Sequence, residues 1–263
     1  MSHQKKTEII DRVKPWELLA EARTPDGTLM SLTRRDTELV IMAGGKILMS
    51  SRMHGSEEAM AEMAFKRLGI RHSALSKGGS TGDGGLPSLL GDACVLIGGL
   101  GLGYTLRATL DLLPSSATVV VSELVPAVVR WNRGVLAPLA GRPLDDPRVR
   151  VVERDVLEVL RANRTTFDAT LLDIDNGPSA LTSHRNGALY SDRGIAAARA
   201  ALKPAGTLAV WSSYDDQQYA RRVRNGGFTV VTKRVRGRPN RGPNHVIYLG
   251  QRPASGRATV SSP

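Results

Sequence analysis

The chain has 263 residues, a formal net charge of +11 and 41% hydrophobic residues, which is enough to bury a sizeable core. No apolar run approaches the ~18 residues that a membrane-spanning helix needs, and the N-terminus lacks the apolar segment of a secretion signal. A lone cysteine, Cys94, excludes an internal disulfide and a cysteine-built metal site. These features predict a cytoplasmic protein with no membrane partner.

Residues 1–72 are expected to form a small N-terminal β domain followed by a linking helix. Residues 27–35 and 38–51 read as short strands, and the AGGK sequence inside the second segment is typical of a hairpin connection. The strand pattern then gives way to apolar residues at helical spacing within residues 53–69, with Gly69 as a stop signal.

The sequence GSEE opens this predicted helix. Ser56 is placed there either as the N-cap of the helix or as a side chain that faces a pocket. Residues 73–90 are rich in Gly and Ser and show no periodicity, which predicts a flexible loop.

From residue 91 onward, apolar strand candidates alternate with helical segments. The strand candidates are residues 94–99, 118–124, 149–155, 167–175 and 206–213, and the helical segments are residues 105–113, 126–135, 156–163 and 192–202. Such alternation is typical of a parallel sheet that is covered by helices on both faces. We therefore expect one Rossmann-like catalytic domain over residues 91–252.

The last two strand candidates differ from the others. Residues 228–235 and 245–252 are joined by a loop that is too short for a crossover helix, so they are expected to pair antiparallel. An α/β fold follows, in which a mostly parallel sheet is closed by an antiparallel hairpin, and this resembles the Rossmann-like class I methyltransferase fold. Residues 253–263 are expected to be a disordered tail.

Three glycines follow the first strand of this domain. Gly99, Gly101 and Gly103 lie in the sequence IGGLGLGY, between an apolar strand and a helix. Residues without a side chain let the backbone pass close to a ligand at a helix N-terminus. This turn is therefore the first candidate element of a nucleoside site.

Acidic residues end the next two strand candidates. Glu123, followed by Leu124, is placed to accept hydrogen bonds from ribose hydroxyls, and Asp155, followed by Val156, is placed to bind an adenine amino group. Either carboxylate taken alone is also compatible with helix capping or solvent exposure. Together with the glycines, however, they mark three successive strand ends. The sequence therefore predicts that an S-adenosyl sulfonium nucleoside binds there.

Two further carboxylates end the fourth strand candidate, in the sequence LLDIDNGPSAL. Asp173 and Asp175 are two residues apart, so they face the same way on an extended segment. One carboxylate would remove a proton from an amine nucleophile, and the other would hold a second positive group. The alternative is that Asp173 caps a turn and Asp175 starts the NGP loop.

The sequence indicates no metal site. The histidines His54, His72, His184 and His245 are scattered along the chain, and none is predicted to be a ligand.

With these motifs in place, the chain resembles the spermidine/spermine synthase family, the polyamine aminopropyltransferases, over most of residues 16–250. IGGLGLGYTLRATL is similar to the glycine motif of that family, SEL and ERD to its ribose and adenine acids, and DIDNGPSAL to its catalytic loop. ALYSDRGIAAARAAL is similar to the helix that follows this loop. The resemblance implies a homodimer that acts on a small amine-like substrate.

The resemblance also implies residue roles. Asp173 would contact the donor and act as the base that deprotonates the attacking amine, and either Asp175 or Asn176 would take the second acidic role. Tyr190 stands where the family has an aromatic residue, and Glu57 stands in SEEAM, where the family carries a Tyr followed by Gln or His that binds donor and polyamine. All of these residues are therefore candidates for substrate binding.

One departure from the family pattern bears on the donor. Leu102 occupies the place of an Asp that holds the ammonium of decarboxylated S-adenosylmethionine in the family. Losing a buried carboxylate opposite an ammonium costs roughly 2–5 kcal/mol. This argues for S-adenosylmethionine (AdoMet) itself as the donor.

The leading hypothesis is an AdoMet-dependent transferase, with methyl transfer to a small amine slightly favoured. The first alternative is a polyamine aminopropyltransferase that uses decarboxylated AdoMet. The second alternative is a non-catalytic nucleoside- or RNA-binding protein, because no acidic residue follows Asp216 in the basic C-terminal region. Nucleic-acid binding is not favoured, since no aromatic residues interleave with KRVRGRPNRGPNH.

Overall fold

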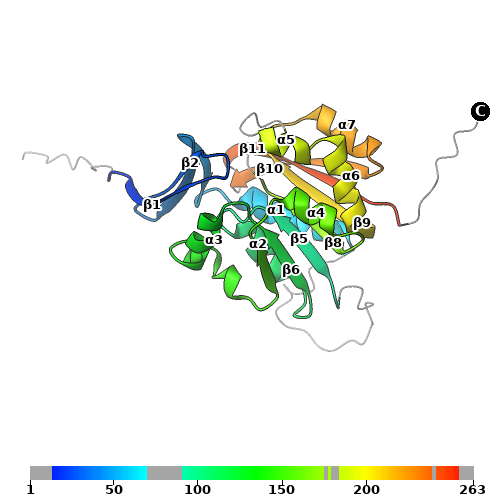
Figure 1. Cartoon of the computed structure of the whole chain (residues 1–263), viewed down its shortest axis with the longest axis horizontal. Helices are drawn as coiled ribbons and strands as arrows, with labels where there is room; N and C mark the ends of the chain where they lie inside the picture. The colour runs from blue at the N-terminus through cyan, green and yellow to red at the C-terminus, as the bar shows by residue number, and fades with distance from the viewer. Residues whose placement is uncertain (1–13, 70–90, 175–176, 179–183, 239–240, 255–263) are drawn as a thin grey trace, which may run out of the picture.

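A computed structural model describes residues 14–69, 91–174, 177–178, 184–238 and 241–254 (Figure 1). The predicted loop at residues 73–90, the predicted site residues Asp175 and Asn176, and residues 255–263 of the predicted tail lie outside these ranges. Within the described ranges, every helix is too short or too polar to span a bilayer.

A four-stranded antiparallel sheet forms the N-terminal part of the chain. Its strands, in spatial order, are β1 (Glu17–Arg23), β2 (Leu29–Arg35), β3 (Glu38–Ala43) and β4 (Lys46–Ser50). The predicted AGGK hairpin is confirmed, because Ala43 pairs with Lys46 across the turn. Strand β1 was not predicted. It is an edge strand whose residues are all exposed or half-buried, so it lacks the apolar alternation of a strand with one buried face.

Helix α1 (Gly55–Arg67) follows this sheet but packs on the large domain, against α2, β9 and β10. Its buried residues include Met60, Ala64 and Phe65, on the face turned toward those elements. The N-cap residue is His54, so the prediction that Ser56 caps this helix is wrong. Ser56 is instead fully buried one residue into the helix.

The large domain is built on a seven-stranded sheet with the order β10-β11-β9-β8-β5-β6-β7. Its strands are β5 (Cys94–Gly98), β6 (Thr118–Ser122), β7 (Val149–Val152), β8 (Phe167–Leu172), β9 (Leu202–Ser212), β10 (Thr229–Arg238) and β11 (Arg241–Gln251). The first five of these pair in parallel, whereas β11 pairs antiparallel with both β9 and β10. The predicted closing hairpin is therefore confirmed.

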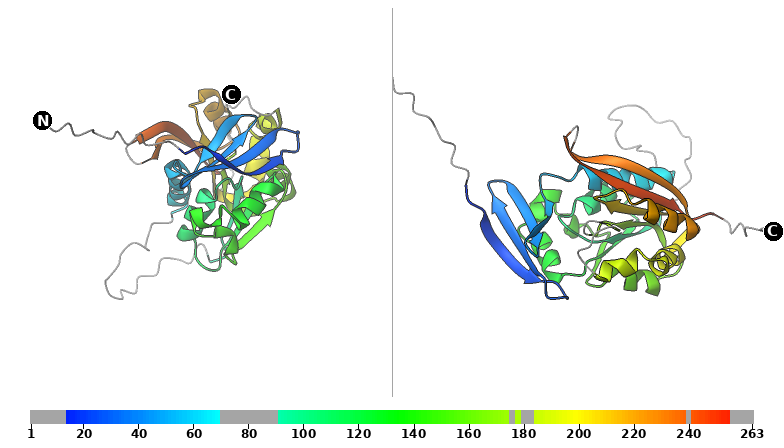
Figure 2. Two further views of the ribbon diagram at one scale, coloured as in Figure 1. Left: turned by 90° about the vertical axis from the view of Figure 1, so that its left-hand side faces the viewer. Right: turned by 90° about the horizontal axis from the view of Figure 1, so that it is seen from above.

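Helices cover both faces of this sheet (Figure 2). They are α2 (Tyr104–Leu112), α3 (Pro126–Arg133), α4 (Val156–Ala162), α5 (His184–Leu189), α6 (Asp192–Ala201) and α7 (Gln217–Asn225), with short 3-10 turns η1 (Ala137–Ala140) and η2 (Pro143–Asp145). Residues from α1, α2 and α3 share one buried cluster with Val95 and Ile97, whereas residues from α4, α6 and α7 share the other with Leu96. Successive side chains of β5 thus fill opposite cores, as the period of a strand requires.

The N-terminal sheet stands beyond one end of the large sheet (Figures 1 and 2). Strands β5, β6, β7 and β8 run parallel, so their carboxyl ends meet at one edge. Met49 of β4 lies close to Gly101 in the turn that follows β5, which places the N-terminal sheet over this edge. The fold thereby brings the predicted strand-end residues opposite the N-terminal strands.

Candidate active site

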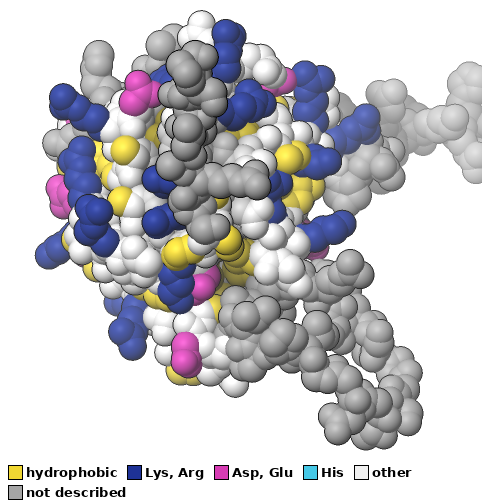
Figure 3. All heavy atoms as spheres, turned by 90° about the vertical axis from the view of Figure 1, so that its right-hand side faces the viewer, with side chains coloured by type: hydrophobic (Ala, Val, Ile, Leu, Met, Phe, Trp, Pro, Cys, Tyr) yellow, Lys and Arg dark blue, Asp and Glu magenta, His cyan; other side chains and the backbone are white. Residues whose placement is uncertain are grey.

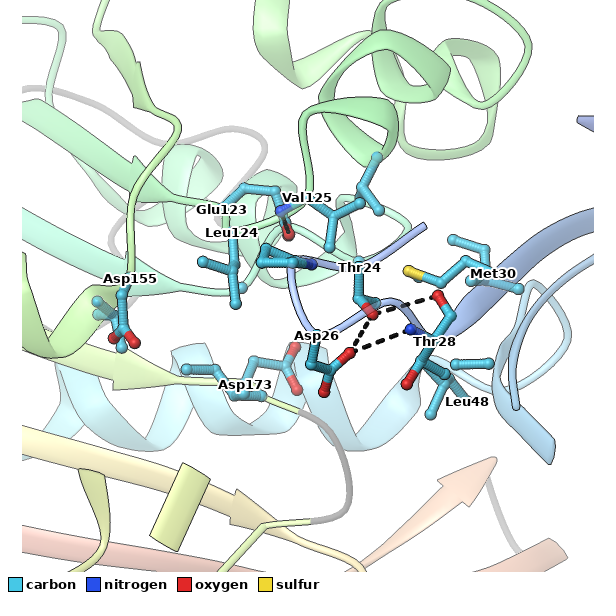
Figure 4. Close-up of a pocket in the computed structure, with 18 of the residues that line it drawn as sticks. Thr24, Asp26, Thr28, Met30, Leu48, Glu123, Leu124, Val125, Asp155 and Asp173 are labelled. Carbon is cyan, nitrogen blue, oxygen red and sulfur yellow. Dashed lines mark hydrogen bonds between the residues drawn. The ribbon is translucent and has the colours of Figure 1, made fainter. Parts of the chain in front are cut away.

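A cavity of about 480 Å³ lies between the N-terminal sheet and the carboxyl ends of the parallel strands (Figure 4). The large domain contributes Gly99, Gly101, Glu123, Leu124, Asp155, Val156 and Asp173 to its walls, and the N-terminal sheet contributes Thr24, Asp26, Thr28, Met30, Lys46, Leu48 and Met49. This volume is in the range of small-ligand sites, about 300–1,000 Å³. The structure thus brings most of the predicted nucleoside-binding residues to one cavity.

The glycine turn has a left-handed backbone, and contacts within the protein account for part of the need for glycine there. Gly99, Gly101 and Gly103 have φ angles of 87°, 52° and 85°. A Cβ at Gly99 would lie 2.3 Å from the carbonyl oxygen of Asp173, so this glycine lets two strand ends pass each other. Gly103 faces Asn132 and Pro143 and does not line the cavity, in contrast to the other two glycines.

Glu123 is held by backbone amides at the end of β6. Its Oε2 accepts a hydrogen bond from the Leu100 amide at 2.9 Å, and its Oε1 accepts one from the Val125 amide at 2.8 Å. The side chain is 7% exposed, and it lines the cavity. Glu123 therefore both ties the glycine turn to the next strand and presents a fixed carboxylate to the cavity.

Asp155 is both a cap and a wall of the cavity. Its Oδ1 accepts a hydrogen bond from the Leu157 amide at 2.8 Å, so it is the N-cap of α4. Asp155 and Val156 also line the cavity. The capping role weighed for Asp155 from the sequence is therefore present, and it coexists with a position suited to a ligand.

Asp173 lies at the end of β8 on the cavity wall. Its Oδ2 accepts a hydrogen bond from the Thr105 hydroxyl of α2 at 2.6 Å, and its amide donates to the Gly98 carbonyl at 2.8 Å. Burial raises the pKa of Asp173 to about 6, even though the Thr105 hydrogen bond favours the ionised form. A carboxyl that is held by one hydrogen bond and has a pKa close to neutral pH is suited to accept a proton.

Glu57, near the start of α1, is the second carboxyl of this region. Burial raises its pKa to about 7, and the negative charge of Asp173 adds to that shift. The Ser56 hydroxyl donates to Glu57 Oε2 at 2.6 Å and acts in the opposite direction. Glu57 and Asp173 come from elements far apart in the chain, and the fold brings the charge of Asp173 close enough to raise the pKa of Glu57.

This pair makes the stability of the protein depend on pH. Folding raises both pKa values from ordinary values of 3.8 and 4.5, so the stability that the two groups contribute is full below pH 4 and falls as the pH rises through 6 and 7. A Glu57→Gln variant keeps a neutral side chain at every pH. We therefore expect the loss of melting temperature between about pH 5 and about pH 8 to be smaller in Glu57→Gln than in the wild type.

Thermal unfolding at the two pH values tests this, with Glu21→Gln as the control. Glu21 is an exposed carboxylate of β1, so its removal takes away the same charge without touching the pair. If Glu57→Gln and Glu21→Gln follow the wild-type pH dependence equally, Glu57 is not a buried, proton-holding group.

Of the four predicted substrate-binding residues, two lie outside the described ranges, and the other two, Glu57 and Tyr190, do not line the cavity. Asp175 and Asn176 are the first two, so their roles stay predictions. Tyr190 is 2% exposed, its hydroxyl donates to the Ile174 carbonyl at 3.4 Å, and its ring packs edge-on against Tyr219. Tyr190 thus supports the backbone behind the cavity and is absent from the cavity wall.

The sequence interpretation missed several polar residues around the site. Asp26 lies in the turn between β1 and β2, where the Thr24 hydroxyl and the Thr28 amide donate to its carboxylate and lower its pKa. Asp26 and Lys46 both line the cavity. The sequence Pro-Asp-Gly at residues 25–27 is typical of a turn and could have indicated this position. Because strand β1 was not predicted, however, the turn could not be placed relative to the site.

Leu102 lies in the hydrophobic core, 5% exposed, and does not line the cavity. Its position therefore says nothing about the charge that the cavity prefers. Among the described residues, no three His, Cys, Asp or Glu side chains are grouped so that they could hold a metal ion.

The large domain has a seven-stranded sheet that is closed by an antiparallel hairpin, and the cavity lies at the carboxyl ends of its parallel strands. This arrangement defines an α/β protein with the class I AdoMet-dependent methyltransferase-like fold. No protein-family model matches the chain. Polyamine aminopropyltransferases of Mycobacterium tuberculosis and Mycobacterium bovis are 34% identical to it over 123 residues. That match covers 46% of this chain and 23% of each relative, so the chain matches less than a quarter of their length.

Solved structures extend the likeness over almost the whole chain. A spermidine synthase from Thermotoga maritima matches 95% of this chain and 84% of its own, with a TM-score of 0.67 and 17% identity. A spermidine synthase in complex with the transition state analogue AdoDATO matches 90% of this chain and 73% of its own, with a TM-score of 0.66 and 17% identity. The chain is thus similar in sequence to polyamine aminopropyltransferases over part of its length and shares the fold of the spermidine synthases, in agreement with the resemblance noted in its sequence.

Proposed function

We propose that this chain is an aminopropyltransferase-like enzyme that binds decarboxylated AdoMet in the cavity and transfers the aminopropyl group to a small amine. The observation that carries the proposal is the carboxyl of Asp173, with its raised pKa, on the wall of a cavity that Glu123 and Asp155 also line. The likeness to polyamine aminopropyltransferases and spermidine synthases supports the same reading.

The cavity walls suit a cationic adenosine derivative. Glu123 and Asp155 are placed where hydroxyl and amino groups of a nucleoside can donate to them. Gly99 and Gly101 leave the turn after β5 without side chains, so a ligand can approach its backbone. A bound sulfonium makes the adjacent carbon electrophilic. The remaining chemistry falls to the protein, which must align the amine and take its proton.

Asp173 is the proposed base. The amine arrives mostly as an ammonium ion and must lose a proton before its lone pair can attack carbon. Thr105 holds one oxygen of Asp173, and the raised pKa makes this carboxylate a better proton acceptor than an ordinary aspartate. Glu57 is proposed to hold the positive charge of the amine and to share the proton with Asp173.

The charge of the cavity bears on the choice of donor. Its walls carry the carboxylates of Asp26, Glu123, Asp155 and Asp173 and the cationic groups of Lys46 and Arg154. Decarboxylated AdoMet carries a sulfonium and an ammonium without a carboxylate, so an acidic cavity favours it over AdoMet. Leu102 supplies no acid for the ammonium of this donor, so one of the carboxylates that line the cavity is proposed to hold it.

Calorimetry with three ligands tests the donor. We expect decarboxylated AdoMet to bind at least about tenfold more tightly than AdoMet, a difference of about 1.4 kcal/mol, and methylthioadenosine to bind in the same cavity. Tighter binding of AdoMet would reject the aminopropyl reading and return methyl transfer to first place. Mass spectrometry of the products formed with a pool of small amines then identifies the acceptor.

Methyl transfer from AdoMet is the second candidate function, and the observation in its favour is Arg154, a cavity-lining cation that can pair with the AdoMet carboxylate. The homodimer predicted from the family resemblance stays a prediction, which sedimentation analysis can test.

Binding of nucleic acid is less well supported. Lys and Arg side chains are spread over the face shown in Figure 3, with acidic and apolar side chains between them. A salt-sensitive gel shift with RNA that persists in Asp173→Asn would support this class.

A further inference from the structure

The turn between β1 and β2 brings a carboxylate to the cavity from the wall opposite the parallel strands. Asp26, in this turn, lines the cavity together with Lys46 at the start of β4. A Cβ at Gly44 would lie 3.5 Å from the Thr28 methyl group, so the β1–β2 and β3–β4 turns lie against each other. Figure 4 shows the carboxylates of Asp26 and Asp173 pointing toward the same part of the cavity. The N-terminal sheet thus places an acid close to the proposed base.

Hydrogen bonds within its own turn hold Asp26 in place. Its Oδ1 accepts from the Thr24 hydroxyl and from the Thr28 amide, the latter at 3.2 Å. Both of these bonds end on Oδ1, so a ligand can approach Oδ2. The same bonds lower the pKa of Asp26, which is therefore ionised at neutral pH. Within the described part of the chain no Lys or Arg forms an ion pair with Asp26, so its charge is open to a cationic ligand.

The other three carboxylates on the cavity wall already have partners or a proposed role. Both oxygens of Glu123 accept hydrogen bonds from backbone amides. Asp155 caps α4 through Oδ1, and Asp173 is the proposed base, which must stay available to the amine. Leu102 supplies no charge from the glycine turn. Asp26 is therefore the lining carboxylate that is best placed to pair with a further positive group.

Resting on the proposed function, we infer that Asp26 of the N-terminal sheet holds the ammonium group at the end of the aminopropyl chain of decarboxylated AdoMet. An acid at that end fixes the chain, so that the carbon next to sulfur faces the amine beside Asp173. AdoMet carries a carboxylate on the same carbon as its ammonium group, and this carboxylate would lie next to Asp26. Like charges so close repel each other, so Asp26 also selects against AdoMet.

The exposure of Asp26 limits how much this contact contributes. Asp26 is an exposed residue, so water already solvates its charge and the ligand replaces that water. Exposed ion pairs are weak, whereas a hydrogen bond to a charged group gains strength when the ligand covers it. We therefore expect Asp26 to change the affinity for the ammonium by about tenfold, which corresponds to one strong polar contact.

Calorimetry with two thioethers isolates this contact from the rest of the nucleoside. One adenosine thioether carries an aminopropyl group on sulfur and the other a propyl group, so they differ in the ammonium alone, and neither has a sulfonium from which an alkyl group could be transferred. We expect Asp26→Asn to bind the aminopropyl compound about tenfold more weakly and the propyl compound as tightly as the wild type does. Asparagine keeps an oxygen that accepts from Thr24 and Thr28, so the turn keeps its shape.

Asp36→Asn is the matched control from the same sheet. Asp36 lies in the turn between β2 and β3, at the opposite end of the strands, where it pairs with Lys14 at 2.9 Å and does not line the cavity. This variant loses the same charge as Asp26→Asn and should bind both thioethers like the wild type. An equal loss of aminopropyl binding in the two variants would indicate an effect of net charge alone and would overturn the inference.

Steady-state kinetics separate the donor from the acceptor. With decarboxylated AdoMet and a small diamine, Asp26→Asn should raise the KM for the donor about tenfold and leave the KM for the diamine unchanged. A rise confined to the KM for the diamine would mean that Asp26 binds the acceptor, and the inference would be rejected.

Failure of this inference and failure of the proposed function give different results. If the wild type forms aminopropyl product but Asp26→Asn binds both thioethers as the wild type does, Asp26 is not the partner of the ammonium and the function stands. If no product forms but Asp26→Asn loses affinity for the aminopropyl thioether alone, the proposed function fails and the ammonium site stands. Equal affinity of the wild type for the two thioethers would show that the cavity has no ammonium site.

Discussion

Asp173→Asn is expected to lower turnover by about 10²–10⁴-fold while the affinity for methylthioadenosine changes little. Asparagine has the same shape and still accepts the hydrogen bond that Thr105 donates to Asp173 at 2.6 Å, so the cavity keeps its form. What the variant lacks is a basic oxygen beside the amine. Product formation with decarboxylated AdoMet and a small diamine gives the rate, and calorimetry with the uncharged nucleoside gives the affinity.

Asp168 provides a matched control on the same strand. It lies at the opposite end of β8, where its carboxylate accepts from the Cys94 amide and pairs with Lys203 at 2.8 Å. Asp168→Asn should leave turnover within about twofold of the wild type and cost at most ~1 kcal/mol of stability, since its ion pair is partly exposed. Full activity in Asp173→Asn would remove Asp173 from the mechanism, and an equal loss in both variants would indicate a general defect of the strand.

Among Gly→Ala substitutions in the glycine turn, Gly99→Ala is expected to lower the free energy of unfolding most, by about 2–4 kcal/mol. The residue has a φ of +87°, and its new Cβ would lie 2.3 Å from the Asp173 carbonyl oxygen. That oxygen belongs to the backbone, so it cannot move aside as a flexible side chain would. Urea unfolding measures the change in the free energy of unfolding.

Gly45→Ala separates the two causes of that loss. Gly45 also has a positive φ, +76°, but a Cβ there would meet nothing within 4 Å. This variant should therefore show only the backbone cost, about 1–2 kcal/mol. The difference between the two variants reports the contact between Gly99 and the strand end that carries Asp173. Equal losses would mean that this close approach does not exist in solution.

Local pattern was sufficient to predict the large domain. Apolar strands such as Cys94–Gly98 bury both faces, so they stand out as short continuous apolar runs between helices. The closing hairpin followed from the short loop between its strands. Strand β1 was missed because an edge strand with no buried face carries no such pattern.

Candidate site residues at strand ends were predictable for the same reason. Parallel strands bring their carboxyl ends to one edge, so Glu123, Asp155 and Asp173 had to lie near one another once the strand order was right. The sequence could not show whether a particular residue faces the cavity or the core. Leu102 and Tyr190 were both read as site positions, and both are buried in packing away from the cavity wall.

The sequence by itself therefore determined the fold class, the glycine turn and the acidic strand ends, because each depends on residues that are neighbours in the chain. Only the tertiary structure decided that Glu57 joins Asp173, that Asp26 faces the same cavity, and that His245 reaches Ser56. These contacts join elements far apart in sequence. Their distances are set by how α1, the N-terminal sheet and β11 pack on the central sheet, which no local pattern encodes.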